Sequence, residues 1–348
     1  MSSAKGTFVV TGTNGAIGSG IVSRFTSNAR AELYHGIYTV RDAAAPAQLL
    51  DDALSKAVAG HSHEKLSLEL TDLDKVRVFA AALNARIESG EVPPIRAIIL
   101  NAGYHEFREQ TWTDDGLDTT FVANYLGHWL LVMLLLKSMD RESGRIIWMS
   151  SWSHNTKDKR NVAYKAPEYQ SILSTDLEPI AKGTWSATAD DNTIWAAGYR
   201  RYGASKLCGV TMIHELQRRL DMDPLLSNIS VLATDPGAVR SRITRRSDSW
   251  WIRVFYLRIL TPTLAALSFS ANGTYRTMKK ASTDIVAAAF DDGPSPLSDR
   301  PKGIFLDGNA LGEYSDEAKD PSKGGVVWKG SVTFSKLKEG ETILQHWQ

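Results

Sequence analysis

TFVVTGTNGAIG, residues 7–18, is the stretch that decides the fold, because a short β-branched and apolar run leads directly into a glycine-rich turn. Glycine adopts positive φ easily and has no side chain, so the backbone N–H groups of such a turn can approach a pyrophosphate. A helix that follows the turn adds the positive end of its dipole. This order of strand, turn and helix is typical of dinucleotide binding, although a glycine turn by itself can also be purely structural.

The rest of the chain alternates short apolar runs with segments of helical length. Strands are predicted at Thr7–Thr11, Gly36–Arg41, Lys65–Leu70, Ala97–Leu100, Gly144–Ser150, Asn228–Ala233 and Gly303–Leu306. Helices are predicted near Ser19–Ser27, Asp74–Glu88, Leu117–Met139 and Tyr202–Leu220. The alternation predicts an α/β fold with one doubly wound, Rossmann-type parallel sheet and helices on both faces.

The composition narrows the class of protein. The 348 residues are 43% hydrophobic and 23% charged, which excludes disorder, collagen and coiled coil. A formal net charge of +1 gives no reason to expect nucleic acid as a partner, so a small, uncharged ligand is expected. Cys208 is the only cysteine, which predicts a reducing compartment, the cytoplasm. No Pro/Gly/Ser-rich linker divides the chain, so a single domain is predicted.

Two apolar segments were candidates for membrane contact. Phe121–Leu136 is shorter than the stretch of about 18 residues that a membrane helix needs, and it is predicted to be a buried helix. The segment Trp250–Phe269 contains Arg253, Arg258 and Pro262 and is predicted to be a substrate lid, with a membrane-surface contact as the alternative. The N-terminus leads straight into the first strand without the apolar region of a secretion signal.

The second predicted strand ends at Arg41-Asp42, where dinucleotide-binding folds contact the adenosine ribose. Asp42 could accept hydrogen bonds from a 2′-hydroxyl group, which favours NAD. Arg41 could pair with a 2′-phosphate, which favours NADP. The choice depends on which side chain points into the pocket, and a solvated Arg-Asp pair is the alternative.

Tyr202 and Lys206 lie one helical turn apart, on one face of a predicted helix. A free tyrosine has a pKa near 10, so it exchanges protons poorly at neutral pH unless a nearby positive charge stabilises its phenolate. Lys206 can supply that charge. The strand before it ends in Ser150-Ser151, and one of these hydroxyl groups could hold a substrate carbonyl oxygen beside the phenol.

In this order along the chain, the turn at residues 11–18, Asn101-Ala102-Gly103, Asn124, Ser150-Ser151 and Tyr202-x-x-x-Lys206 together resemble the short-chain dehydrogenase/reductase superfamily. The resemblance implies that Tyr202 gives or takes the proton and that Ser151 orients the substrate oxygen. Lys206 would lower the pKa of the tyrosine and bind the nicotinamide ribose. Asn124 would kink its helix and hold a water in the proton relay. The implied sheet has about seven strands in the order 3-2-1-4-5-6-7.

The resemblance also implies a nicotinamide cofactor, NADP(H) in preference to NAD(H), because Arg41 is similar to the arginine of NADP-preferring members. The implied cofactor contacts are Gly12, Thr13, Asn14, Gly15, Ile17, Gly18, Arg41, Asp42, Glu69, Leu70, Asn101, Ala102, Gly103, Tyr202, Lys206, Pro236, Gly237, Val239 and Ser241. Two positions depart from the family pattern: Gly15-Ala16, where the glycine more often stands at the second position, and Glu69, which replaces an aspartate over the adenine.

The chain is longer than compact members of this superfamily. The extra length is assigned to an insertion at about 152–200, a substrate-covering segment at about 240–275 and a C-terminal extension at about 291–348. These resemble the longer reductases of the retinol-dehydrogenase and protochlorophyllide-reductase type. Trp152, Trp185 and Trp195 of the insertion indicate a bulky apolar substrate, or else they simply pack the insertion.

The histidines are predicted to bind no metal, because His61 and His63 have no third ligand nearby in the sequence. His105 and His154 follow predicted active-site strands and could line the pocket from their loops, but each is predicted to be a partly exposed loop residue. Cys208 is predicted to be a small helix residue and not a nucleophile.

The predicted function is an NADPH-dependent carbonyl reductase, or an alcohol dehydrogenase in reverse, for a bulky and largely apolar substrate. The alternatives are reduction of a C=C or C=N bond on the same scaffold, and a sensor protein that binds NADP(H) without catalysis. The predicted helix at Leu117–Met139 resembles the dimer helix of the superfamily, so both monomer and homodimer are considered.

Overall fold

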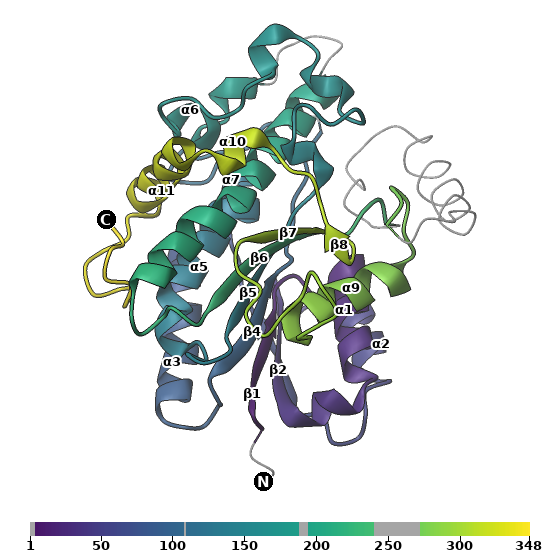
Figure 1. Cartoon of the computed structure of the whole chain (residues 1–348). Helices are drawn as coiled ribbons and strands as arrows, with labels where there is room; N and C mark the ends of the chain where they lie inside the picture. Colours follow the sequence, from purple (N-terminus) through teal and green to yellow (C-terminus); the bar gives the residue numbers. More distant parts are fainter. Residues whose placement is uncertain (1–3, 108, 188–193, 240–271) are drawn as a thin grey trace.

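The computed structural model describes residues 4–107, 109–187, 194–239 and 272–348. In these residues the chain forms an eight-stranded sheet with the order β3-β2-β1-β4-β5-β6-β7-β8 (Figure 1). All neighbours pair in parallel except β7 and β8. The strands are β1 (Gly6–Val10), β2 (Tyr34–Val40), β3 (His63–Ser67), β4 (Ile95–Leu100), β5 (Arg145–Met149), β6 (Ser230–Asp235), β7 (Ile304–Asp307) and β8 (Ala310–Leu311). The seven predicted strands and their order are confirmed, and β8 is an addition that the sequence did not predict.

Each central strand divides its side chains between two hydrophobic cores, one on each face of the sheet. In β1, Val9 belongs to one core, whereas Phe8 and Val10 belong to the other. A parallel sheet covered on both faces needs apolar side chains on both sides of its strands, which explains the nearly continuous apolar runs in the sequence.

Helices cover both faces of the sheet (Figure 1). One layer contains α1 (Ala16–Thr26), α2 (Gln48–Leu54) and α9 (Met278–Phe290). The opposite layer contains α3 (Leu73–Glu88), α4 (Thr119–Phe121), a π-helix (Val122–Leu126), α5 (Gly127–Leu135) and α7 (Ile194–Met222). The short α6 (Glu178–Ala181) lies in the insertion, and α10 (Asp316–Lys319) and α11 (Pro321–Ser335) lie in the C-terminal extension.

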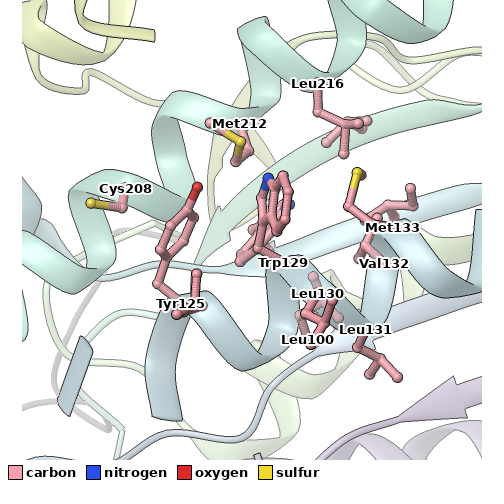
Figure 2. Packing of buried hydrophobic residues seen from close by; sticks show 14 of the residues in the cluster. Leu100, Tyr125, Trp129, Leu130, Leu131, Val132, Met133, Cys208, Met212 and Leu216 are labelled. Atoms are coloured by element: carbon pink, nitrogen blue, oxygen red, sulfur yellow. The ribbon is translucent and has the colours of Figure 1, made fainter. Parts of the chain in front are cut away.

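Thr119–Ser138 is the one helical segment of the described residues that is long and apolar enough to cross a membrane. However, 89% of its most apolar window is buried inside the protein. Figure 2 shows Trp129 of this segment packed beneath Met212 and Leu216 of α7. The segment therefore forms the centre of the core, as predicted.

Helix α7 begins earlier than predicted, at Ile194 instead of Tyr202, so the insertion ends before residue 200. Gly198 weakened the helical signal in the sequence. In the structure this glycine lies against the backbone of Glu106, where any side chain would clash. Arg200 is buried and donates from Nε to Ser186 Oγ at 2.8 Å, so the first turns of α7 pack under the insertion.

The C-terminal extension contains α11, a helix that the sequence did not predict. Two adjacent glycines and a third, Gly330, hid this helix in the sequence. A Cβ atom at Gly330 would lie 2.5 Å from Leu177, so the close contact with the insertion requires glycine. Two residues before Gly330, Trp328 is fully buried, edge-on to Trp129 with ring centroids 5.3 Å apart. The C-terminal extension thus covers α5 and α7.

Candidate active site

The glycine turn between β1 and α1 has the geometry that a pyrophosphate requires. Gly12 has φ +69°, and a Cβ atom there would lie 2.7 Å from Cα of Ala102. A Cβ atom at Gly18 would lie 2.5 Å from the carbonyl oxygen of Gly12. The first turn of α1 contains no acidic residue, and no side chain caps it. The turn therefore fits an anionic group held by backbone N–H groups at a helix N-terminus.

Asn101-Ala102-Gly103, which follows β4, holds this turn in place. Asn101 donates from Nδ2 to the carbonyl oxygen of Thr11 at 2.8 Å. The backbone N–H of Ala102 donates to Thr11 Oγ1 at 2.9 Å, and the same hydroxyl lies 2.9 Å from Nε2 of the buried His128. The motif thus joins the carboxyl ends of β1 and β4, where the strand order reverses and where such sheets bind their ligands.

Arg41 and Asp42 have different surroundings at the end of β2. Asp42 uses its carboxylate locally, because Oδ1 accepts a hydrogen bond from the backbone of Ala44 at 2.9 Å. The Arg41 side chain is 65% exposed and pairs with Glu69, Nε to Oε2, at 2.9 Å. Glu69 also accepts a 2.7 Å hydrogen bond from Thr71. The carboxylate of Glu69, which replaces the aspartate of the family pattern, is therefore occupied by Arg41 and Thr71. Both side chains are exposed, so the end of β2 carries a carboxylate turned towards its own backbone beside a guanidinium paired with Glu69.

The predicted catalytic residues meet at the carboxyl ends of β5 and β6. Tyr202 and Lys206 lie on one face of α7, with Lys206 Nζ 5.6 Å from the centre of the tyrosine ring. Lys206 Nζ donates to the carbonyl oxygen of Met149 at 2.9 Å, which ties it to the end of β5. Ser151, two residues further on, makes a side-chain hydrogen bond with Tyr202.

Burial controls the proton affinities of this group. It raises the pKa of Tyr202, and the negative charge of Asp235 raises it further, whereas the hydrogen bond from Ser151 lowers it. Burial lowers the pKa of Lys206 to about 8, against the opposing effect of Asp235. The tyrosine of the free protein is therefore a neutral phenol at pH 7, able to donate a proton.

Asn124 lies in the five-residue π-helix Val122–Leu126, an irregular turn at the position where a kink is predicted. Its amide exchanges two hydrogen bonds with the backbone of Tyr104: Nδ2 donates to the carbonyl oxygen at 2.9 Å, and Oδ1 accepts from the N–H at 2.7 Å. Nδ2 also donates to Ser205 Oγ at 3.0 Å, and Ser205 in turn donates to the carbonyl oxygen of Tyr202 at 2.6 Å. Asn124 therefore links the loop after β4 to the catalytic turn of α7.

The prediction that His105 and His154 are partly exposed is wrong, because both are buried. His154 packs against the active-site strand: Nδ1 lies 2.6 Å from the carbonyl oxygen of Ser151, and Nε2 accepts from the backbone of Ser315 at 3.3 Å. His105 stacks on Tyr202, with ring centroids 4.3 Å apart and planes 11° apart. The sequence showed that both follow strands, but not that the insertion and the tail cover them.

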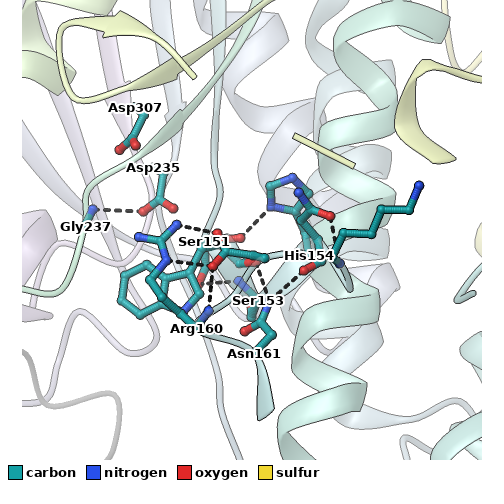
Figure 3. A network of polar contacts seen from close by, with 12 residues as sticks. Ser151, Ser153, His154, Arg160, Asn161, Asp235, Gly237 and Asp307 are labelled. Carbon is teal, nitrogen blue, oxygen red and sulfur yellow. Dashed lines mark hydrogen bonds and ion pairs between the residues drawn. The ribbon is translucent and has the colours of Figure 1, made fainter. Parts of the chain in front are cut away.

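Sequence reasoning missed Asp235, although it immediately precedes the predicted Pro236-Gly237 turn. Its carboxylate is buried and accepts from the N–H of Gly237 at 2.8 Å (Figure 3). Gly237 has φ +73°, and a Cβ atom there would lie 3.0 Å from Arg276. Burial raises the pKa of Asp235. Figure 3 shows this end of β6 beside Ser151 and Arg160.

The remaining predicted site residues occupy the same edge of the sheet. Pro236 and Val239 are buried beyond β6, and Leu70 is buried beyond β3. Thr13 is buried and donates from Oγ1 to Thr39 at 3.0 Å, and Asn14 Oδ1 accepts from the start of α2 at 3.3 Å. Ser241 and the segment Trp250–Phe269 lie outside the described residues.

The insertion packs mainly on itself. Trp152 lies under the guanidinium of Arg160 at 4.5 Å, and Trp185 packs edge-on against Tyr169 at 5.8 Å. Trp195 is 46% exposed. Trp152 and Trp185 therefore have packing roles, Trp195 is largely exposed, and the ring that stacks on Tyr202 is His105.

A phosphate-binding turn at the strand reversal, next to a half-buried serine and a buried Tyr-Lys pair, defines an oxidoreductase of the dinucleotide-binding α/β class. Comparisons agree with this class. The family model for short chain dehydrogenases matches residues 6–167. The short-chain dehydrogenase iccH of Talaromyces variabilis is 41% identical over 368 residues and covers 99% of both chains.

Protochlorophyllide reductase B of Oryza sativa subsp. japonica is 25% identical over 352 residues, covering 96% of this chain and 78% of that protein. The solved structure of an NADPH-bound carbonyl reductase from chicken fatty liver shares the fold, with a TM-score of 0.54 at 18% identity over 88% of this chain and 98% of that one. This chain belongs to the short-chain dehydrogenase/reductase family, and its oxidoreductase chemistry uses a nicotinamide cofactor.

Proposed function

We propose that the protein is an NADPH-dependent carbonyl reductase that acts on a bulky, largely apolar ketone or aldehyde. The observation that carries the proposal is the buried contact of Ser151 with Tyr202, with Lys206 one turn away on the same helix. Aromatic rings next to the phenol and a formal net charge near zero favour an uncharged substrate.

When bound, the nicotinamide supplies the hydride that reaches the carbonyl carbon. Ser151 Oγ donates a hydrogen bond to the carbonyl oxygen and orients it. Tyr202 Oη gives its proton to that oxygen as negative charge develops there, which forms the alcohol and leaves a phenolate. The ammonium group of Lys206 stabilises this phenolate, and Asn124 fixes the helical turn that holds both side chains.

The preference for NADPH rests on the contrast between Arg41 and Asp42. The negative charge of the Asp42 carboxylate opposes a 2′-phosphate, but the hydrogen bond that it accepts from the backbone of Ala44 directs one oxygen towards its own turn. The Arg41 guanidinium keeps its NH groups available while Glu69 holds Nε.

Substitution of Tyr202 by Phe tests the catalytic assignment. The variant should bind NADPH as the wild type does and lose about 100- to 10,000-fold in kcat with a panel of ketones, because the proton donor is gone. Tyr199→Phe is the matched control: it removes a hydroxyl one turn away, which donates to Asn161 at 2.6 Å, and should keep turnover. Undiminished turnover by Tyr202→Phe would refute the assignment, and cofactor binding without any hydride transfer by the wild type would favour the sensor.

We further propose a cytoplasmic, monomeric protein. The single cysteine, Cys208, is buried in α7, which suits a reducing compartment. Helix α11 packs on α7 and α5, and α5 belongs to the predicted helix Leu117–Met139 that resembles the dimer helix of the superfamily. Gel filtration with light scattering should give the mass of one chain, and a stable dimer would contradict this proposal.

A further inference from the structure

His105 is fixed in place more firmly than its position in a loop would suggest. The residue before it, Tyr104, is held at both backbone polar groups by the Asn124 side chain, at 2.7 and 2.9 Å. The His105 ring then lies between Phe107, at a centroid distance of 3.8 Å, and Tyr202, at 4.3 Å. Both faces of the imidazole are therefore covered, and only its edge can make a polar contact.

That edge carries an unsatisfied atom. His105 is only 6% exposed, and its Nε2 is buried without a hydrogen-bond partner. A buried polar nitrogen with no partner is destabilising, and a ligand that supplies the missing partner relieves that cost. The other buried histidine next to Ser151, His154, has a partner within reach of each ring nitrogen, so this feature is not general to the site.

The ring is neutral at physiological pH. Burial lowers the pKa of His105 to about 3, and the positive charges of Arg201 and Lys206 lower it as well. A neutral imidazole carries one N–H donor and one acceptor nitrogen, so it can pair with a hydroxyl group in either tautomer. It cannot serve as the proton source at pH 7, a role that Tyr202 already fills.

We propose that His105 is a specificity-determining residue whose Nε2 forms a hydrogen bond with a second oxygen of the substrate, next to the carbonyl group that Tyr202 protonates. The inference rests on the proposed carbonyl reduction and names its substrate class, a hydroxylated or otherwise oxygenated ketone. The imidazole stacks on the phenol ring with centroids 4.3 Å apart, so a substrate that reaches the phenol also comes close to the imidazole. A substrate with oxygen close to that carbonyl would satisfy the nitrogen, whereas a purely hydrocarbon ketone would leave it unpaired.

The test compares two ketones that differ only by a hydroxyl in place of a methyl group, β-hydroxypropiophenone and butyrophenone. Calorimetric titration into the NADP⁺ complex measures binding without turnover. The wild type should bind the hydroxy ketone about tenfold more tightly, the effect of one hydrogen bond to an otherwise unpaired group. His105→Phe, which keeps a stacked ring, should bring the ratio close to one, and His105→Asn should restore part of the preference.

Phe107→Leu is the matched control, because it changes the other stacking neighbour without removing a nitrogen, and it should keep the preference. Equal or undetectable binding of the two ketones by the wild type, or an unchanged ratio in His105→Phe, would overturn the proposal. NADPH oxidation is measured in parallel: its absence with both ketones would refute carbonyl reduction, whereas the binding ratio decides the role of His105.

Discussion

Replacement of Arg41 by Ala should convert an NADPH-preferring enzyme into one that discriminates little between the two cofactors. The guanidinium is the only positive group that the described end of β2 presents beside the ribose position, and NADH has no phosphate for it to bind. The affinity for NADPH should therefore fall while the affinity for NADH stays nearly constant.

The size of the effect follows from the exposure of Arg41. A sheltered, charge-assisted hydrogen bond contributes about 1.5–3 kcal/mol, whereas an exposed ion pair contributes about 0.2–1 kcal/mol. The side chain is 65% exposed and already pairs with Glu69, so an intermediate value of about 1–2 kcal/mol is appropriate. This corresponds to a loss of about 5- to 30-fold in affinity for NADPH.

Fluorescence titration of both cofactors, at low and at high salt, measures this loss. The preference of the wild type should shrink as salt screens the exposed charge. Glu69→Gln serves as the opposite perturbation: it removes the carboxylate that competes with the phosphate for Arg41, so NADPH should bind more tightly. An equal loss for NADH and NADPH in Arg41→Ala would show that the arginine supports the fold of the pocket and does not read the phosphate, and no loss at all would refute the assignment of NADPH.

Three further outcomes can be measured directly. The pKa of Lys206, lowered by burial to about 8, predicts that kcat/KM for ketone reduction falls as the pH rises through that value, because the uncharged amine no longer stabilises the phenolate; a flat profile from pH 7 to about 9 would contradict this. Burial lowers the pKa of His105 and His128 to about 3 and that of His154 to about 4. In the unfolded chain these histidines titrate near pH 6.5, so below that pH the unfolded chain binds protons while the native histidines stay neutral down to their lowered pKa values. Urea titrations should therefore show the free energy of unfolding fall as the pH falls below about 6.5, by up to about 1.4 kcal/mol per pH unit for each histidine, and His128→Gln should reduce this slope. Trp328→Ala should lower the free energy of unfolding by about 3–5 kcal/mol and promote self-association through the uncovered faces of α5 and α7, as gel filtration would reveal; wild-type stability would show that α11 is dispensable.

The features that the sequence predicted correctly depend on residues that are close together in the chain. The glycine turn, the apolar strands and the Tyr202–Lys206 spacing are local patterns, and the structure has each of them. Helix α11 and the start of α7 were missed because glycines there permit close contacts with Leu177 and with Glu106. Those contacts join segments that lie far apart in the chain. Neighbouring residues show only that glycine lowers helix propensity, and they do not show the distant contact that requires it.

The same distinction explains why the catalytic residues could be predicted and why the burial of His105 and its stacking on Tyr202 could not. Tyr202 and Lys206 are related by one turn of one helix, but His105 reaches Tyr202 only because Asn124 binds the backbone of Tyr104 on one side and Ser205 on the other. Asn124 therefore positions the proton donor and the group stacked on it through a single amide. Removal of the Asn124 amide should therefore shift Tyr202 and His105 together. It would break the contact with the loop after β4 and the contact with α7 at once, and both contacts are needed to hold the loop against the helix.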